Sequence, residues 1–337
     1  MKNKIFGSLA AFGLSAGVLF GAPQAAASPE AFAGMKPATI KLAHVVNERD
    51  SFHLSAVRFK EIVEERSGGK LSVELFPNAV LGDERTLLEG MQMGTVDMGV
   101  ITNGPVANFV EQMAVFELPF LFPTPEAAYK VLDGEIGQEL LGRLERVNLK
   151  GLAYAERGFR NLTNSRRAVH GPADVQGMKI RVMENPVYID TFRALGANAV
   201  PMAWTEALTA MQQGTIDGQE NPVNVIHSFK LSETQKHMSL TRHTYAPAIF
   251  VMGLDRFKRL PEPAQALVKS AAQEAAEHGR RMNAEMQAAQ LAELRAAGMQ
   301  IDESPDVAAF QKAIESVYAK YESRFGDYLP RIRAALQ

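Results

Sequence analysis

The chain has 337 residues and no cysteine, and its 36 Lys and Arg residues against 38 Asp and Glu residues give a formal net charge of −2. Without cysteine, disulfide bonds and a lipid-modified N-terminal Cys are excluded. The weakly acidic balance argues against a nucleic-acid partner, because binding to nucleic acid needs a basic surface.

The N-terminal segment has the pattern of an export signal. Lys2 and Lys4 precede an apolar run over 5–20, which small residues follow as far as Ala27. We therefore predict a signal peptide over 1–27, cleaved near Ala27, with Ala33 as the alternative position. No later apolar run reaches the roughly 18 residues of a membrane span, so no stable membrane insertion is expected.

Strands and helices are predicted to alternate along the chain. Hydrophobic periodicity and the Gly, Pro and Asn stop signals delimit them. The expected strands are 39–44, 71–76, 151–154, 179–182 and 199–202, and the expected helices are 52–66, 124–147, 188–195, 263–297 and 306–325. This alternation favours a mainly parallel sheet in an α/β fold.

One helix-to-strand phrase occurs twice. LEGMQMGTVD at 88–97 returns as LTAMQQGTID at 208–217, with six identical positions. Each copy reads as a helix end, a Gly stop and the start of a strand. A repeat of this kind indicates two similar lobes with a cleft between them, and clefts bind small molecules.

The helix predicted over 263–297 is unusually long. At about 1.5 Å per residue it would extend roughly 50 Å, more than the roughly 35–40 Å width of a lobe of about 150 residues. It could therefore lie across both lobes. The alternative is a pair of helices broken at Gly279.

Two arginines are the main candidates for ligand binding. Arg181 lies at the end of the strand 179–182, and ligands of open α/β sheets bind beyond the carboxyl ends of strands. Its guanidinium could hold a carboxylate with two parallel hydrogen bonds, although most arginines are simply solvated. Arg160 follows the strand 151–154, where the chain is expected to cross between the lobes.

Asn221 and Trp204 are weaker candidates. The amide of Asn221 could bind at the edge of the cleft, but Asn before Pro is also an ordinary turn residue. Trp204 is the only tryptophan. It could form a wall of the pocket or belong to the core.

Signs of catalysis are weak. The chain has no G-x-S-x-G or H-E-x-x-H sequence, no Gly-rich phosphate loop after a strand, and seven His residues without a clear metal-ligand spacing. The sequence therefore favours the binding of an anion over its chemical conversion.

The chain resembles the DctP-type substrate-binding proteins of tripartite ATP-independent periplasmic (TRAP) transporters. The resemblance lies in SGGKLSVELFPNAVLGDERTLLEGMQMGTVDM (67–98), FELPFLF (116–122), DVQGMKIRV (174–182), PMAWTEALTAMQQGTIDGQENP (201–222) and the long helix. It implies a type II periplasmic-binding-protein-like α/β fold, with two lobes joined by crossover strands and braced by the long helix. The expected lobe limits are 28–157 with 246–290, and 158–245 with 291–337.

The resemblance also implies a binding site. The carboxylate-binding arginine of the family corresponds to Arg181. Three further residues of this chain match a second arginine, an asparagine and an aromatic residue that line the cleft in relatives. These are Arg160, Asn221 and Trp204, and loops of the first lobe would add Asn47 and Thr102 or Asn103.

The resemblance implies a periplasmic receptor that passes a small organic acid to large and small membrane subunits. We expect a monomer without a cofactor. DGQENP at 217–222 departs from the DGAENN of many C4-dicarboxylate binders, so the sequence does not identify the acid. It also does not decide whether a metal ion bridges the ligand, as in some relatives. Two alternatives remain: an exported enzyme acting on organic or sugar acids, with Glu184 and Glu220 as its acid and base, and a ligand-sensing receptor.

Overall fold

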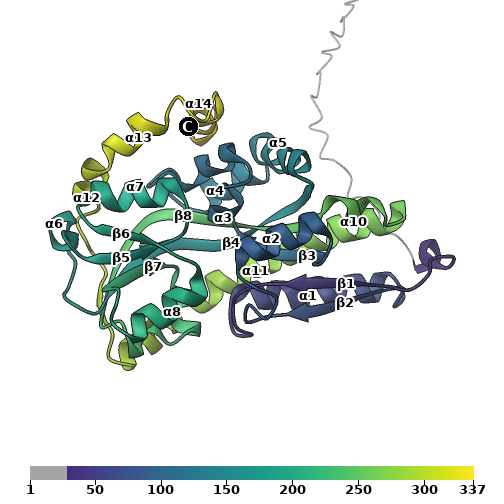
Figure 1. Ribbon diagram of the computed structural model, residues 1–337, viewed down its shortest axis with the longest axis horizontal. Helices are drawn as coiled ribbons and strands as arrows, with labels where there is room; N and C mark the ends of the chain where they lie inside the picture. The colour runs from purple at the N-terminus through teal and green to yellow at the C-terminus, as the bar shows by residue number, and fades with distance from the viewer. Residues whose placement is uncertain (1–28) are drawn as a thin grey trace, which may run out of the picture.

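A computed structural model describes residues 29–337, so the predicted signal peptide lies outside the described residues. Its centre is one nine-stranded sheet in the order β2-β1-β3-β8-β4-β7-β5-β6, with β9 paired to β8. Helices cover this sheet, and the first and second halves of the chain form its two ends (Figure 1). The two-lobed α/β architecture is confirmed.

The first end of the sheet is a β-α-β-α-β unit. After the short η1 (Pro29–Phe32), β1 pairs in parallel with β2 and β3. Its elements are β1 (Ala38–Ala43), α1 (Ser51–Arg66), β2 (Leu71–Phe76), α2 (Glu84–Met93) and β3 (Met98–Thr102). Asp50 and Asp83 cap α1 and α2, each accepting a backbone N–H with its carboxylate, as helix N-termini require.

The second end repeats this layout. Here β5 pairs in parallel with β6 and β7. Its elements are β5 (Lys179–Val182), α7 (Pro186–Ala194), β6 (Asn198–Pro201), α8 (Trp204–Gln212) and β7 (Gly218–Asn221). The repeated phrase occupies the same place in both units, with Gly94 (φ 80°) and Gly214 (φ 67°) in the left-handed conformation behind α2 and α8. The predicted internal repeat is confirmed.

Two long strands join the units. β4 (Leu149–Asn164) and β8 (His237–Gly253) lie side by side in the middle of the sheet and pair antiparallel with each other, while β8 pairs antiparallel with β3 and β4 with β7. The sheet is therefore mixed: the pairings within each unit are parallel, as expected, and those of the two crossover strands with each other and with the units are antiparallel. Residues 151–154 are only one part of β4.

The long helix is continuous. α11 extends over Glu262–Ala296 and packs against α1, β4 and α9 (Val223–Ser228). Gly279 does not break it: a Cβ at this position would lie 2.1 Å from the Ser55 Oγ of α1. The glycine thus allows close packing of two helices, and the alternative of two shorter helices was wrong.

Two other predicted helices are divided. Gly134, in an extended conformation, separates α4 (Pro125–Leu132) from α5 (Glu135–Arg143) and the following η3 (Leu144–Val147), so 124–147 is not one helix. The predicted helix 306–325 consists of α12 (Val307–Ala313) and α13 (Glu315–Tyr321). α13 packs on α7, and α14 (Tyr328–Leu336) packs on α4 and α5.

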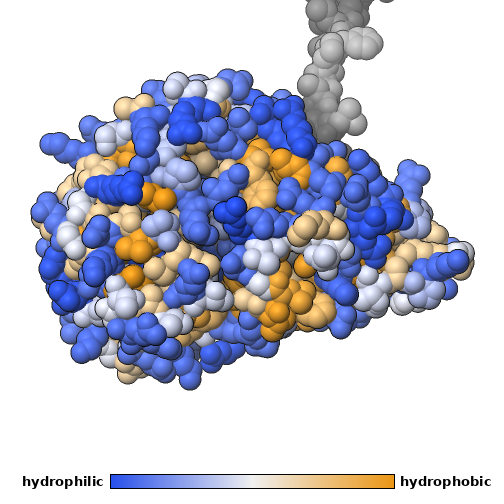
Figure 2. Space-filling view, viewed as in Figure 1, coloured by the Kyte–Doolittle hydropathy of each residue, from blue (hydrophilic) through white to orange (hydrophobic). Residues whose placement is uncertain are grey.

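The remaining elements are short. They are α3 (Asn103–Val106), η2 (Glu111–Glu117), α6 (Pro172–Val175), η4 (Leu231–Glu233), α10 (Leu254–Lys258) and β9 (Gln300–Asp302). Within residues 29–337, no helix combines the length and apolarity needed to cross a membrane. On the visible face, apolar side chains form separate patches among hydrophilic ones (Figure 2).

Candidate functional site

Arg181 is a buried cation without an anionic partner. It stands near the end of β5, and its side chain is only 4% exposed. Its Nε and Nη2 both donate to the Met202 carbonyl, at 3.0 and 2.8 Å. No carboxylate of the described residues lies within ion-pair distance of it, although a buried charge is costly without one.

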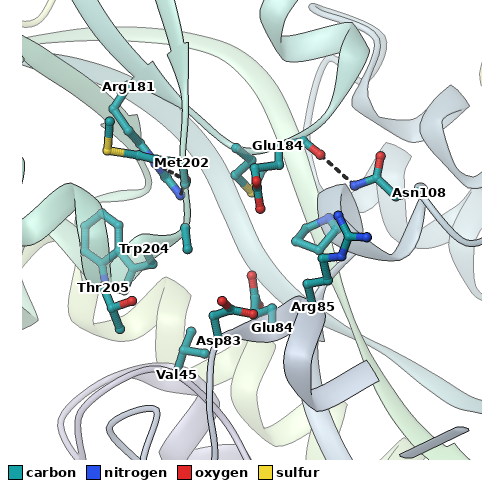
Figure 3. A pocket seen from close by; sticks show the side chains of 13 residues that line it. Val45, Asp83, Glu84, Arg85, Asn108, Arg181, Glu184, Met202, Trp204 and Thr205 are labelled. Atoms are coloured by element: carbon teal, nitrogen blue, oxygen red, sulfur yellow. Dashed lines mark hydrogen bonds between the residues drawn. The ribbon is translucent and has the colours of Figure 1, made fainter. Parts of the chain in front are cut away.

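The pocket beside Arg181 lies between the two units. One wall comes from the second unit and the other from the first (Figure 3). The second unit supplies Arg181, Met183, Glu184 and Met202–Thr205, and the first supplies Val45, Asp83–Arg85, Pro105 and Asn108. A small ligand in this pocket would contact both lobes at once.

Electrostatics around Arg181 favour an anionic ligand. Burial lowers the pKa of its guanidinium to about 10, Glu220 and Glu84 raise this pKa, and Arg160 lowers it further. The group thus stays charged at neutral pH but has lost much of its hydration. An anion placed against it would restore that lost stabilisation in a site of low dielectric constant.

Two hydrogen bonds join the walls near the mouth of the pocket. Asn108 Nδ2 donates to the Glu184 carbonyl at 2.6 Å (Figure 3), and Asn185 Nδ2 donates to the Gly104 carbonyl at 2.9 Å. Both bonds connect the segment after β3 with the segment after β5. The two units are therefore held together at this cleft.

Arg160 lies outside the pocket and already has a carboxylate partner. It is 1% exposed on β4, and its Nε and Nη2 both donate to the carboxylate of Glu220, which also lies within 3.2 Å of His243 Nε2. Burial opposes the charge on Arg160, but the Glu220 carboxylate raises the pKa of the guanidinium overall. This buried ion pair connects β4 with β7 of the second unit.

Asn221 and Asn47 do not line the pocket either. Asn221, at the end of β7, is buried and donates to Gln219 Oε1 at 2.6 Å. Asn47, in the loop after β1, donates to the Ser228 carbonyl at 3.1 Å and thereby connects the first unit to the end of α9. Both amides have protein partners.

Thr102 and Asn103 lie behind the first wall. The Thr102 backbone N–H donates to Glu84 Oε1 at 2.6 Å, so Thr102 fixes a residue that does line the pocket. Asn103 is fully buried and donates to the Met113 carbonyl and to Glu117 Oε1. Neither side chain forms part of the pocket lining.

Trp204 and Glu184 do line the pocket with Arg181. The indole of Trp204 is 7% exposed, lies 5.5 Å from the Arg181 guanidinium carbon and contacts the ring of Phe229 edge-on. Its Nε1 is a buried donor without a hydrogen-bond partner. Glu184 is exposed at the mouth, whereas Glu220 is outside the pocket, so these two carboxylates are not arranged as an acid and base pair around it.

Sequence reasoning missed the acidic residues of the first wall. Asp83 and Glu84 begin α2, and their carboxylates lie across the pocket from Arg181 (Figure 3). The available signal was the repeated phrase itself, because the helix that carries it begins at Glu84 as the second copy begins at Trp204. Both N-termini face the same cleft.

Comparison with known proteins decides the family. Residues 42–324 match the model of the family described as bacterial extracellular solute-binding protein, family 7, or DctP. The chain belongs to this family. It is a DctP-type substrate-binding protein of the TRAP class, as the resemblance implied, and it shares the family's two-lobed fold.

Similar proteins are known from several bacteria. A solute-binding protein of Verminephrobacter eiseniae is 45% identical, covering 82% of this chain and 83% of its own. The 2,3-diketo-L-gulonate-binding periplasmic protein of Escherichia coli is 39% identical, covering 82% and 84%. The crystal structure of a TRAP solute-binding protein from a Polaromonas species, bound to D-erythronate, is 38% identical with a TM-score of 0.86, covering 88% and 98%. These relatives are binding proteins of transporters, not enzymes.

Proposed function

We propose that this DctP-family protein captures a small organic acid through an ion pair between the ligand carboxylate and Arg181. The observation that carries the proposal is a buried guanidinium in the interlobe pocket with a carbonyl but no carboxylate beside it. A ligand carboxylate would supply the missing partner with two parallel hydrogen bonds, a geometry that suits arginine better than lysine.

The chemistry of the relatives' ligands supports an acid. The Escherichia coli relative is named for 2,3-diketo-L-gulonate, and the Polaromonas structure contains D-erythronate. Both names denote carboxylates, which Arg181 could bind in the same way. Trp204 and Glu184 line the same pocket, and we assign them to the rest of the ligand; Arg160 and Asn221 would act from outside the lining.

Closure of the lobes would complete the site. We place the hinge on β4 and β8, where the register shifts between Glu156 and Gly158 and Gly158 (φ 106°) pairs with Ala246. The shift coincides with the expected lobe limits of 28–157 with 246–290, and 158–245 with 291–337. Closing would remove the ion pair from water and strengthen it.

Export and delivery follow from the same proposal. Cleavage near Ala27 would release the protein into the periplasm, where it would act as a monomer and present its ligand to the large and small membrane subunits of the transporter. No catalytic step is needed for this role. Recovery of the bound acid in unchanged form, after prolonged incubation with the protein, is the expected result.

The test is calorimetry after a thermal-shift screen of sugar acids, dicarboxylates and 2-oxo acids, because a ligand of the folded state raises the melting temperature. Arg181→Ala should weaken binding of the best acid by about 2–5 kcal/mol, or roughly 30- to several-thousand-fold. Arg333→Ala, on the exposed side of α14, is the matched control and should bind as the wild type does. An unchanged Kd in Arg181→Ala would refute the proposed site.

A further inference from the structure

A second pocket lies at the crossover strands, away from Arg181. Its walls come from β4, β8, α9, α11 and the start of α4, and it shares no lining residue with the first pocket. Phe159 of β4 lines it, whereas the next residue, Arg160, points to Glu220. Because successive residues of a strand point to opposite faces, the second pocket lies on the other face of the sheet from the Arg160–Glu220 pair.

Arg242 brings a strained backbone and an unpaired cation to this second pocket. The register of β4 and β8 shifts here, so residues 240–243 of β8 bulge out opposite a single residue of β4, Asn161. Within the bulge Arg242 has left-handed backbone (φ 46°), and its N–H donates to Asn161 Oδ1 at 3.2 Å. Its guanidinium carbon lies 4.4 Å from the centre of the Phe159 ring. Strain of this kind in a non-glycine residue is concentrated at functional sites.

The fold supplies no carboxylate partner for Arg242. In the part of the chain that the structure describes, no carboxylate lies within ion-pair distance of its guanidinium. Hydrogen bonds at the start of α4 are the main cause of the lowered pKa of Glu126, and the charge of Arg242 is a lesser cause. Glu126 is therefore a neighbour at longer range and not a fixed partner of Arg242.

Glu156 is the one charge of opposite sign among the residues that line the second pocket. It is 8% exposed, and its two oxygens accept from the Tyr129 hydroxyl and from Asn283 Nδ2, but no basic side chain of residues 29–337 lies within ion-pair distance. Burial raises the pKa of Glu156, against these hydrogen bonds and the more distant charge of Arg280. Since both oxygens accept, the surroundings suit the ionised form, which a cationic group in the pocket would stabilise.

Two buried amide oxygens of the same lining have no donor. Asn224 of α9 and Gln290 of α11 are 2% and 6% exposed. Neither Asn224 Oδ1 nor Gln290 Oε1 has a hydrogen-bond partner. A buried acceptor without a donor is costly, and a ligand that carries N–H groups would satisfy both oxygens.

The second pocket adjoins the proposed hinge. A Cβ at Gly158 would lie 3.1 Å from Asn283 Nδ2 and 3.4 Å from Glu156 Oε1. By the expected lobe limits, Asn283 and Glu156 belong to the first lobe, whereas Arg242 and Asn224 belong to the second. A ligand in this pocket would therefore contact both lobes on the side of the sheet away from the Arg160–Glu220 pair.

We propose that the second pocket binds a neutral α-amino acid as its zwitterion. The carboxylate would pair with Arg242, and the three N–H groups of the ammonium would donate to Glu156, Asn224 and Gln290. An anion alone would leave Glu156 without a cation, and a cation alone would leave Arg242 without an anion. A zwitterion matches both charges of the lining, and this inference does not depend on Arg181.

The first test titrates the wild-type protein and Arg181→Ala with L-alanine, L-serine, L-glutamine and L-leucine. At least one should raise the melting temperature and give a calorimetric Kd, with the same value in both proteins. For the best binder, the amine without the carboxylate and the 2-hydroxy acid without the ammonium are matched probes. In Arg181→Ala, each should bind about tenfold or more weaker than the amino acid. No binding of any of the four, or equal binding of either matched probe, would overturn the inference.

Two variants locate the amino acid. Arg242→Gln and Glu156→Gln each remove one charge of the lining and should weaken binding by about fivefold or more. Arg333→Gln and Glu74→Gln remove the same charges at exposed positions and should bind as the wild type does. Arg242 is itself exposed, so its variant should melt as the wild type does without ligand. Equal affinity in Arg242→Gln and Arg333→Gln would show that the assigned site is wrong.

Arg181→Ala separates this inference from the proposed function. Loss of the amino acid in Arg181→Ala would place it in the first pocket and overturn the inference. Retention of the amino acid in Arg181→Ala, with its loss in Arg242→Gln, is the expected result. Binding of the organic acid in Arg181→Ala tests the proposed function alone, so the two failures give different results.

Discussion

Two buried arginines near the cleft, Arg160 and Arg181, differ in one respect. Arg160, on the middle strand β4, donates twice to the carboxylate of Glu220, whereas Arg181, at the end of β5, has only the Met202 carbonyl. Arg157 and Arg280, the other buried arginines of residues 29–337, also pair with carboxylates, Asp50 at 2.9 Å and Asp133 at 2.5 Å.

The two arginines differ in whether the fold itself supplies a carboxylate partner for the guanidinium. A guanidinium buried with its partner contributes to the fold whatever else it does, because its charge is compensated before any ligand arrives. A guanidinium buried without a partner carries a cost that folding alone does not repay, and this cost is the basis of the proposed anion site at Arg181. Equal burial of the same residue type therefore has two opposite meanings in this molecule.

The largest expected effect is a loss of stability when Arg160 is replaced. Arg160→Ala would leave the Glu220 carboxylate buried and unpaired, and should lower the free energy of unfolding by about 3–5 kcal/mol. Urea denaturation of the ligand-free protein measures this. The double variant Arg160→Met with Glu220→Leu should recover most of the loss, and a loss below about 1 kcal/mol in the single variant would show that the ion pair is not structural.

The free energy of unfolding should also depend on pH through Glu117, whose charge interacts with Arg160 and Glu220. Burial raises the pKa of Glu117 to about 7, against hydrogen bonds from Tyr188 and Asn103 that favour its charged form. Because the raised pKa belongs to the folded state, the protonated form stabilises folding at low pH, and up to about 3 kcal/mol of stability is lost as the pH rises from about 4.5 through about 7.

Glu117→Gln removes this titration. The Gln oxygen can still accept from Asn103, while its NH₂ group would donate to the Tyr188 oxygen in place of the bond that the Tyr188 O–H donates to Glu117. Denaturation at pH 5 and pH 8 should show a smaller decrease in the free energy of unfolding for the variant than for the wild type, and Glu74→Gln should behave as the wild type. The same pH dependence in Glu117→Gln and wild type would show that Glu117 does not titrate in this range.

The smallest effect concerns Arg181 itself. Arg181→Lys keeps a positive charge but loses the planar, two-pronged geometry, so binding of the cognate acid should weaken by about 1–2 kcal/mol. The ligand-free stability should change by less than about 1 kcal/mol, since no ion pair is lost. A stability loss comparable with that of Arg160→Ala would remove the distinction between the two arginines.

Much of the fold follows from local signals. The repeated phrase around Gly94 and Gly214 predicted two equivalent units, and the apolar stripe of 263–297, interrupted at Gly279, predicted the long helix within a residue at each end. No element was assigned to 237–253, which became β8, and the antiparallel pairing of β4 and β8 in the middle of the sheet was not predicted. Pairing partners and strand direction depend on contacts far apart in the chain, which hydrophobic periodicity does not encode.

The sequence predicted only part of the site, because contacts between distant residues decide the rest. Arg181 could be found because its position at a strand end has a general meaning in α/β sheets. Arg160 looked equivalent, since nothing local shows that Glu220, 60 residues away, will satisfy it. Asp83 and Glu84 looked like an ordinary helix start, and they line the pocket only because the two units face each other across a cleft.

The most direct test is a crystal structure of the protein with the acid that the calorimetric screen selects. We expect the ligand carboxylate within hydrogen-bonding distance of the Arg181 guanidinium, with Arg160 still bound to Glu220. A ligand carboxylate held elsewhere, with Arg181 bound only to the Met202 carbonyl as in the free protein, would contradict this account.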